Sequence, residues 1–347
     1  MQKRPKPINS LMKYLRNEKG IDISGSSDKL KLRNMGYYHG YKGYRYIFSP
    51  SNKIQFNNFD ELNYIYSFDT KLKALFYPWV MFIETALKNY VLESVVESAK
   101  SDNFNTIYNS VLDNFKKFIN SSNVKREKKA KKEALKKRIE LRSRIYKLLA
   151  DKFNLGNKIA NHFLSNDRSV PIWAIFELIT LGEFGYFVSC INFEVRSEIS
   201  KNIGIKQSDD SDASLTQKFI FILKEFRNAI AHNDIVFDTR FRTSEIKDNV
   251  FSAISNETSV KALSFKTITD YLVFVVYLLK KFGVSKKELN KLVNDFDSAV
   301  TLLKHSIDAS TFNKIIYTDN RNKIKSLKEF ILRRTNITDH CHKVSLW

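Results

Sequence analysis

Three polar side chains close a long apolar stretch, and their types suit phosphodiester chemistry. Arg227, Asn228 and His232 follow the apolar run 219–226. Histidine moves protons near neutral pH, and the planar guanidinium of arginine holds a phosphate through paired hydrogen bonds. On a helix, Asn228 and His232 share a face, whereas Arg227 lies about 140° from His232 and must reach the same cleft with its long side chain.

The end of this stretch also has a purely structural interpretation. Asn233 and Asp234 favour helix ends, so His232 is expected in the last turn, where the helix dipole favours the imidazolium form. A helix at the edge of the core that ends on a capping histidine accounts for the same residues. Spacing alone leaves both interpretations open.

Composition limits the function classes. The chain has 347 residues with a formal net charge of +21, and 43% of its residues are apolar. The apolar content indicates a globular protein. The positive charge predicts an anionic partner, for which nucleic acid is the leading candidate. Cys190 and Cys341 are its two cysteines, which disfavours a disulfide framework or a zinc finger and fits a reducing cytoplasm. The longest apolar run, 271–279, is too short to span a bilayer.

The segment 36–46 interleaves aromatic, basic and glycine residues. Its glycines predict a tight backbone, such as a short strand or a turn. Aromatic and basic side chains in alternation suit stacking on bases and pairing with phosphates. The alternative is a lid of tyrosines that packs on a helical core. The candidate RNA-binding residues here are Tyr37, Tyr38, Tyr41, Lys42, Tyr44 and Arg45.

A second candidate RNA-binding segment is the charge run 125–144. It holds eleven Lys and Arg against three Glu, and contains no Gly or Pro. These features predict a long basic helix or helical hairpin that contacts phosphates, and a solvated helix face is the alternative. Its basic residues are Lys125, Arg126, Lys128, Lys129, Lys131, Lys132, Lys136, Lys137, Arg138, Arg142 and Arg144.

The rest of the chain is dominated by helical periodicity, and few glycines and prolines interrupt it, so we expect an all-α fold. Residues 57–98 are expected to form helices that begin at an Asn58 cap, with Pro78 opening a new helix. Glu84 and Lys88 are spaced for a surface ion pair.

Further along, a helix from 170 to 190 is expected to break at 181–185 because of its two glycines. Ser214 and Ser285 each match a capping box. An apolar helix is expected at 267–282, and His340-Cys341-His342 at the terminus is expected to fray rather than bind metal.

Four segments occur in a distinctive order along the chain. They are the tyrosine-rich segment 36–46, the stretch Leu62 to Phe68 continued by Asp69, Leu72, Lys73 and Leu75, the pattern Glu84-x3-Lys88-Asn89, and the pattern Arg227-Asn228-x3-His232. Together they resemble the Abi (abortive infection) family of the AbiD/AbiF type, within the HEPN superfamily of helical, RNA-linked domains. The resemblance covers roughly residues 8–305.

The resemblance implies an all-α, HEPN-like helical bundle and its organisation. A tyrosine-rich extension (1–50) would pack on a helical domain (51–305) with a basic helical insertion at about 104–150, followed by a basic tail (306–347). It also implies a metal-independent endoribonuclease that needs no cofactor. Arg227, Asn228 and His232 would be catalytic, and Glu84, Lys88 and Asn89 would support the cleft. Two copies of the motif would meet in a homodimer.

The same resemblance implies a role in defence against phage, as a latent toxin controlled by or complexed with a small structured RNA. A second hypothesis is a non-catalytic RNA-binding scaffold or sensor that uses the cleft for recognition. A DNA-binding regulator ranks third, because no reading helix of a helix-turn-helix is evident.

Overall fold

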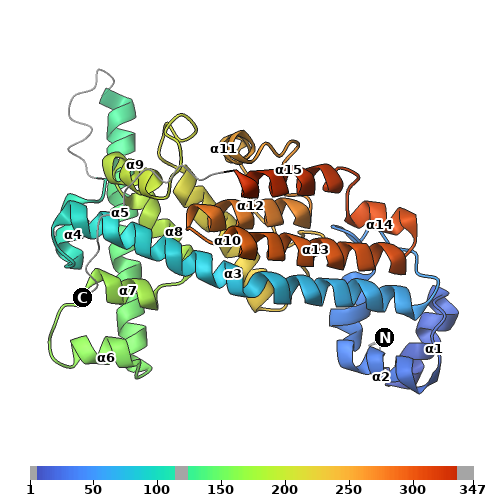
Figure 1. Ribbon diagram of the computed structural model, residues 1–347. Helices are drawn as coiled ribbons and strands as arrows, with labels where there is room; N and C mark the ends of the chain where they lie inside the picture. The colour runs from blue at the N-terminus through green and yellow to red at the C-terminus, as the bar shows by residue number, and fades with distance from the viewer. Residues whose placement is uncertain (1–5, 114–123, 334–347) are drawn as a thin grey trace.

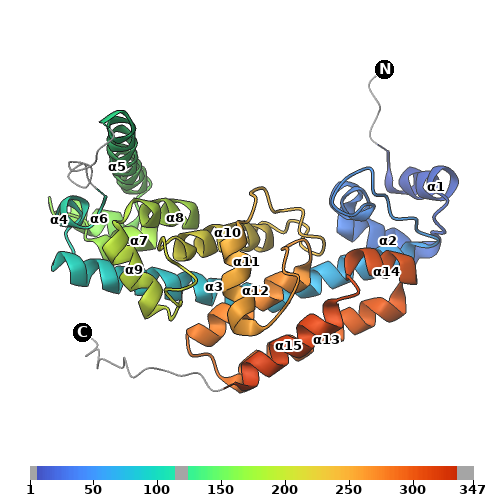
Figure 2. The same ribbon diagram turned by 90° about the horizontal axis from the view of Figure 1, so that it is seen from above.

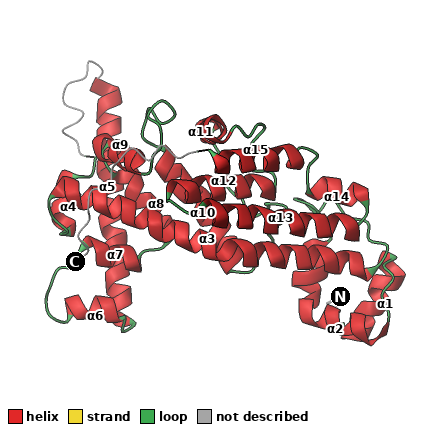
Figure 3. Cartoon of the chain, in the orientation of Figure 1, coloured by secondary structure: helices red, strands yellow, loops and turns green. Residues whose placement is uncertain are grey.

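A single long helix organises the fold. In the computed structural model, which describes residues 6–113 and 124–333, helix α3 (Phe59–Ala99) is 41 residues long and extends across much of the molecule (Figure 1). It begins at Asn58, whose side chain accepts a hydrogen bond from the Glu61 amide at 3.0 Å, as the sequence predicts. The expected all-α fold is confirmed, since the described residues form fifteen α-helices and one π-helical turn, with no β-strand (Figure 3).

The expected helix start at Pro78 is wrong, because α3 continues through it. Proline removes one helical hydrogen bond and crowds the carbonyl of the residue four positions earlier. Pro78 and Ala74 are both exposed, so the lost hydrogen bond lies on the solvent side of α3. Apolar residues on the opposite side, including Phe76 and Val80, are fully buried. Packing along the buried side therefore keeps the helix continuous.

A helical bundle packs on the first half of α3. It consists of α10 (Leu215–Ala231), α12 (Ile268–Lys281), α13 (Lys286–Ser306) and α15 (Asn320–Leu332). Helix α12 lies inside this bundle, and every residue from Ile268 to Lys280 is buried, in agreement with the apolar helix predicted there. Two shorter helices, α11 (Asp248–Thr258) and α14 (Ala309–Ile315), lie at its periphery. Much of the expected tail, 306–347, thus forms helices that pack on the bundle.

A second group of helices surrounds the other end of α3. It contains α4 (Phe104–Ser110), α5 (Val124–Asn154), α6 (Lys158–Leu164), α7 (Ile172–Leu178), α8 (Leu181–Cys190) and α9 (Phe193–Asn202). The basic run forms the one long helix α5, which crosses this end and projects beyond it (Figures 1 and 2). No helix in the described part combines the length and the apolar character that crossing a bilayer requires.

The N-terminal residues form a small helical module at the start of α3. It comprises α1 (Ile8–Lys19), α2 (Gly25–Met35) and the π-helical turn η1 (Gly36–Lys42). The strand or turn expected from the glycines is therefore a π-helical segment. Gly36 has φ of 72°, which favours glycine. Gly43 lies so close to Ile235 that an added Cβ would be 2.7 Å from its Cδ1 atom. Gly36 thus allows the abrupt change of chain direction between α2 and η1, and Gly43 allows the chain to lie close to the loop after α10.

Two other local expectations are corrected. The break between α7 and α8 falls at Ile179 and Thr180, where Thr180 and Glu183 form a capping box, and not at 181–185. Ser214 makes no capping box, because its hydroxyl donates to Asp212 and its amide donates to the buried Asp210. The capping box of Ser285 with Glu288 is confirmed.

Gly185 lies in the middle of α8 because α8 and α10 are in close contact. A Cβ at this position would lie 3.0 Å from Phe221 and 3.1 Å from Ile220. One at Gly182 would lie 3.4 Å from the flexible Lys224 side chain and 3.8 Å from Thr180 Oγ1. The glycine that predicted a break is therefore a packing residue.

We expect Gly185→Val to lower the free energy of unfolding by about 1 to 3 kcal/mol, because the added side chain overpacks the α8–α10 contact. Chemical denaturation followed by circular dichroism measures this loss. Gly182→Val is the matched control in the same helix and should cost less. Equal losses for both variants would mean that close packing does not select Gly185.

Candidate functional site

The candidate site lies along one edge of the contact between α3 and α10. Beneath it, the rings of Phe76 and Phe226 pack at 5.1 Å between centroids. At the edge, Arg227 Nε donates to Glu84 Oε2 at 3.1 Å, and Lys88 Nζ lies 3.3 Å from Glu84 Oε1. The buried carboxylate of Glu84 therefore has a cation at each oxygen. These cations neutralise a charge that has little access to bulk water.

Arg227 keeps part of its guanidinium available. Its Nη1 atom donates to Asn228 Oδ1 at 3.3 Å, and its Nη2 atom has no hydrogen-bond partner among the described residues. The side chain is 28% exposed. Glu84 and Asn228 thus bind the Nε and Nη1 groups of the guanidinium, and the Nη2 group can donate a hydrogen bond to an external anion.

His232 ends α10 at the C-cap position. Its amide donates to the Asn228 carbonyl at 2.9 Å, which places both residues in the last turn as expected. The imidazole is exposed and makes no hydrogen bond or ion pair with any described residue. It is therefore free to accept or donate a proton at an external group.

Asn89 differs from its neighbours in the predicted Glu84-x3-Lys88-Asn89 pattern. It is exposed and contacts neither Arg227 nor Glu84. At five residues from Glu84 it lies about 140° around the helix. The structure thus brings Glu84, Lys88, Arg227 and Asn228 together and leaves Asn89 aside.

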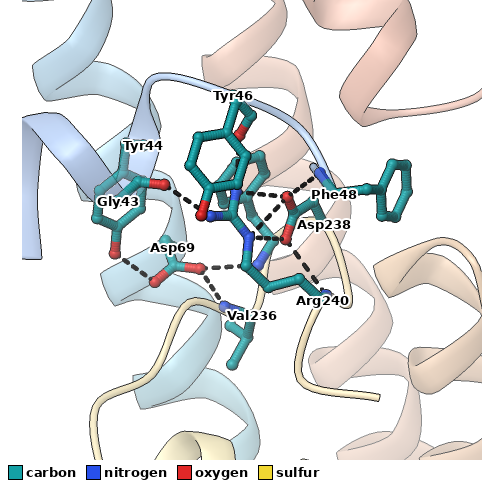
Figure 4. A network of polar contacts seen from close by, with 9 residues as sticks. Gly43, Tyr44, Tyr46, Phe48, Asp69, Val236, Asp238 and Arg240 are labelled. Atoms are coloured by element: carbon teal, nitrogen blue, oxygen red, sulfur yellow. Dashed lines mark hydrogen bonds and ion pairs between the residues drawn. The ribbon is translucent and has the colours of Figure 1, made fainter. Parts of the chain in front are cut away.

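The loop that follows His232 is fixed by the buried carboxylate of Asp69 on α3 (Figure 4). Asp69 Oδ1 accepts hydrogen bonds from the Val236 and Phe237 amides, both at 2.7 Å. Its Oδ2 atom accepts from the Tyr44 hydroxyl at 2.7 Å and lies 2.8 Å from Lys73 Nζ. One side chain therefore joins α3, the N-terminal module and the loop after α10.

Lys73 carries this connection to the residue after His232. Its ammonium donates to Asn233 Oδ1 at 2.7 Å. Asn233 has φ of 57°, a left-handed conformation that asparagine tolerates better than most residues and that ends the helix. Lys73 thus holds the turn that directs the chain away from His232.

A second buried carboxylate, Asp238, strengthens the same junction. Arg240 donates to Asp238 and also to the carbonyls of Gly43 at 2.8 Å and Tyr46 at 2.6 Å. Asp238 also accepts from the Phe48 amide at 2.7 Å, and the Arg240 guanidinium lies 4.2 Å from the centre of the Tyr46 ring. The sequence reading missed Asp238 and Arg240, although a charged pair directly after the apolar run 235–237 was a visible signal.

Helix α5 uses its basic residues in two ways. Arg138 donates to the Tyr108 carbonyl at 2.7 Å, and Arg142 donates to Asn105 Oδ1 at 2.9 Å. Both guanidinium groups lie near the Tyr108 ring, and Arg144 lies 4.4 Å from the Tyr186 ring centre. These arginines hold α5 on α4 and α8.

The lysines of α5 face outward. Those with exposed side chains are Lys128, Lys129, Lys131, Lys132, Lys136, Lys137 and Lys147. The side chains of Lys125 and Arg126 lie outside the described residues. The helix therefore presents a row of ammonium groups to solvent while its arginines anchor it.

The predicted tyrosine cluster is partly buried. Tyr44 and Tyr41 are buried, and Tyr37 stacks on Tyr41 at 5.6 Å. Burial raises the pKa of Tyr37 to about 12 and that of Tyr44 well above its ordinary value, so both hydroxyls stay protonated. Tyr38 is 77% exposed with Lys42 Nζ 4.1 Å from its ring centre.

The other two residues of the set lie beside this cluster. Arg45 lies 6.0 Å from the Tyr41 ring. Lys42 is also 5.4 Å from the Tyr37 ring. Tyr41 and Tyr44 are thus buried in packing contacts, while Tyr38 and Lys42 remain accessible.

Among the described residues, no group of three or more His, Cys, Asp or Glu side chains is placed to hold a metal ion, and His340-Cys341-His342 lies outside the described range.

Comparison with known proteins identifies a family. Residues 30–238 match the family model described as Abi-like protein, and this range contains the Asp69 network as well as Glu84, Arg227 and His232. A search of curated proteins and a search of solved structures found no match.

We expect Asp69→Asn to destabilise the fold by about 3 to 5 kcal/mol, because it removes the counter-charge of the buried Lys73. Asp60→Asn is the control. Asp60 is 59% exposed in its ion pair with Lys31, so its loss should cost less than about 1 kcal/mol. Urea denaturation of both variants measures the difference, and similar midpoints would show that the network contributes little to stability.

Proposed function

This chain belongs to the Abi-like protein family, which supports a role in abortive infection, and we propose that in this role it is a latent RNA-cleaving toxin. The proposed activity is that of a metal-independent endoribonuclease of the HEPN type. The observation that carries the proposal is the end of α10. There, a free imidazole and a guanidinium with an unpaired Nη2 occur within six residues, in the last turns of a packed helix and at its C-cap.

The proposed reaction uses only protein side chains. His232 accepts the proton of a ribose 2′-OH, and the 2′ oxygen attacks the adjacent phosphorus. The bond to the 5′ oxygen breaks, and a protonated general acid supplies the proton that this leaving group needs. The products are a cyclic phosphate and a 5′-OH.

Arg227 acts on the charge that develops in this reaction. Its Nη2 group would donate to a non-bridging phosphate oxygen, where negative charge increases in the transition state. Asn228 and Glu84 orient the guanidinium through the hydrogen bonds at 3.3 and 3.1 Å. Lys88 balances the remaining charge of Glu84.

A second proton-transfer group is required, because one histidine cannot be base and acid in the same step. The chain contains one good copy of the Arg227–His232 pattern. We therefore propose a homodimer in which two copies face each other, so that one His232 acts as base and the other as acid.

The proposed RNA contacts extend beyond this site. The exposed lysines of α5 would contact phosphates, which adds affinity and salt dependence without sequence specificity. The accessible pair Tyr38 and Lys42 would suit an unpaired base and its phosphate. A small structured RNA is the proposed partner, recognised by shape and backbone.

A non-catalytic RNA-binding scaffold is the second candidate function. The observation that favours it is the ion pair of Arg227 with Glu84, which already neutralises part of the guanidinium charge. In that case the same cleft recognises RNA without cleaving it.

We expect His232→Ala to reduce RNA cleavage at least about 100-fold and to abolish growth arrest, because general acid–base catalysis contributes that much or more. RNA affinity should be unchanged. The measurements are cleavage of labelled RNA, growth after induction, and filter binding.

His305→Ala is the matched control, since His305 is also exposed but lies on α13. A wild type that binds RNA tightly, neither cleaves it nor arrests growth, and does not depend on His232 would favour the scaffold.

Charge reversal on α5 tests the phosphate contacts. The triple variant Lys128→Glu, Lys129→Glu and Lys132→Glu should make the slope of log affinity against log salt shallower by roughly 2 to 3. Each phosphate contact that is lost means that fewer counterions are released when RNA binds. Reversal of the exposed Lys261, Lys287 and Lys304 changes the net charge equally and serves as control. Equal slopes for the two triple variants would exclude α5 as a specific phosphate-binding surface.

A further inference from the structure

Tyr77 is an exposed aromatic residue on the α3 edge that forms the candidate site. Lys73, Tyr77, Glu84 and Lys88 are separated by four, seven and four residues, a spacing that places all of them on one stripe of a helix. Lys73 contacts Asn233 and Glu84 contacts Arg227. Tyr77 therefore lies on α3 between the two residues that hold the start and the end of the 227–233 segment.

The surroundings of Tyr77 do not account for it structurally. Its side chain is 49% exposed, and it makes no hydrogen bond or ring contact with any described residue. Its neighbour Phe76 fills the core against Phe226. The helix is thus held in place by Phe76, and an aromatic ring at position 77 adds little to that packing.

An exposed ring next to phosphate-binding groups has a specific use. A nucleobase stacks on an aromatic face whatever its identity, and such stacking contributes substantially to single-strand binding. With Arg227 Nη2 and Lys88 on the same edge, a phosphate held there would place an adjacent base within the region of Tyr77.

From this arrangement we propose that Tyr77 is the base-stacking residue of the site. It binds an unpaired nucleobase next to the phosphate held by Arg227 and thereby sets where RNA is cleaved. This inference rests on the proposed function and deepens it by naming the substrate class, an unpaired segment of RNA. It assigns no proton transfer to the tyrosine.

Tyr64 provides a matched comparison on the same helix. It is 42% exposed, similar to Tyr77. At thirteen residues before Tyr77 it lies about 140° around the helix axis, and it lines a shallow pocket with Leu302 of α13 rather than with α10. If the loss of any exposed tyrosine from α3 weakened RNA binding, Tyr64→Ala and Tyr77→Ala would therefore weaken it equally.

The test uses a background that binds without cleaving. Full-length protein with His232→Ala is titrated with single-stranded 12-nucleotide RNAs, each with 2-aminopurine at one position. We expect quenching at particular positions from stacking on Tyr77. Adding Tyr77→Ala should remove that quenching and weaken binding roughly 10-fold, whereas Tyr77→Phe and Tyr64→Ala should retain both.

Several results would overturn the proposal. One is unchanged quenching with Tyr77→Ala, and another is quenching that depends on Tyr38→Ala instead. A third is a change from dimer to monomer in Tyr77→Ala by light scattering, which would make Tyr77 an interface residue.

Cleavage assays in protein that retains His232 distinguish this proposal from the proposed function. If wild-type protein cleaves RNA and Tyr77→Ala shifts or blurs the cleavage sites, both stand. If wild-type protein does not cleave but the Tyr77-dependent quenching persists, the stacking site stands and the nuclease activity fails. If the cleavage pattern is the same in Tyr77→Ala, the stacking role fails and the nuclease stands.

Discussion

A carboxylate buried away from water must be balanced inside the protein, and Asp69 places that requirement at the centre of this molecule. Its two oxygens accept hydrogen bonds from two loop amides and a tyrosine hydroxyl and form an ion pair with Lys73. Losing a neutral partner leaves a polar group unpaired at a cost of about 1 to 3 kcal/mol, and losing Lys73 leaves the charge unpaired at a cost of about 3 to 5 kcal/mol. The N-terminal module, α3 and the loop after α10 are therefore held in one arrangement, and the position of His232 follows from it.

The basic side chains have different roles in different parts of the chain. Arg138, Arg142 and Arg240 join helices and loops to one another, because planar guanidinium groups stack on rings and donate to carbonyls or carboxylates. The lysines of α5 are used outside, where a compact, hydrated charge costs nothing to expose. The net charge of +21 is therefore not a uniform coat, because much of it lies on one projecting helix.

The length of α3 sets the distances between these parts. The tyrosine-rich module packs near its start and α5 lies near its end (Figure 1). The residues that meet α10, from Lys73 to Glu84, lie between them. Under the proposed function, an RNA that contacted both the module and α5 would have to extend along this helix past the end of α10.

The sequence by itself determined the all-α class, the helical character of the basic run, the buried helix α12 and the cap at Asn58, because helical periodicity and capping are local properties. It also placed Arg227, Asn228 and His232 at a helix end. Only the tertiary structure decided that Pro78 stays inside α3, that Gly185 serves close packing, and that Asp69, Asp238 and Arg240 form a junction. These depend on contacts between residues far apart in the chain, such as Asp69 with Val236, and the burial that makes such contacts strong exists only once the chain has folded.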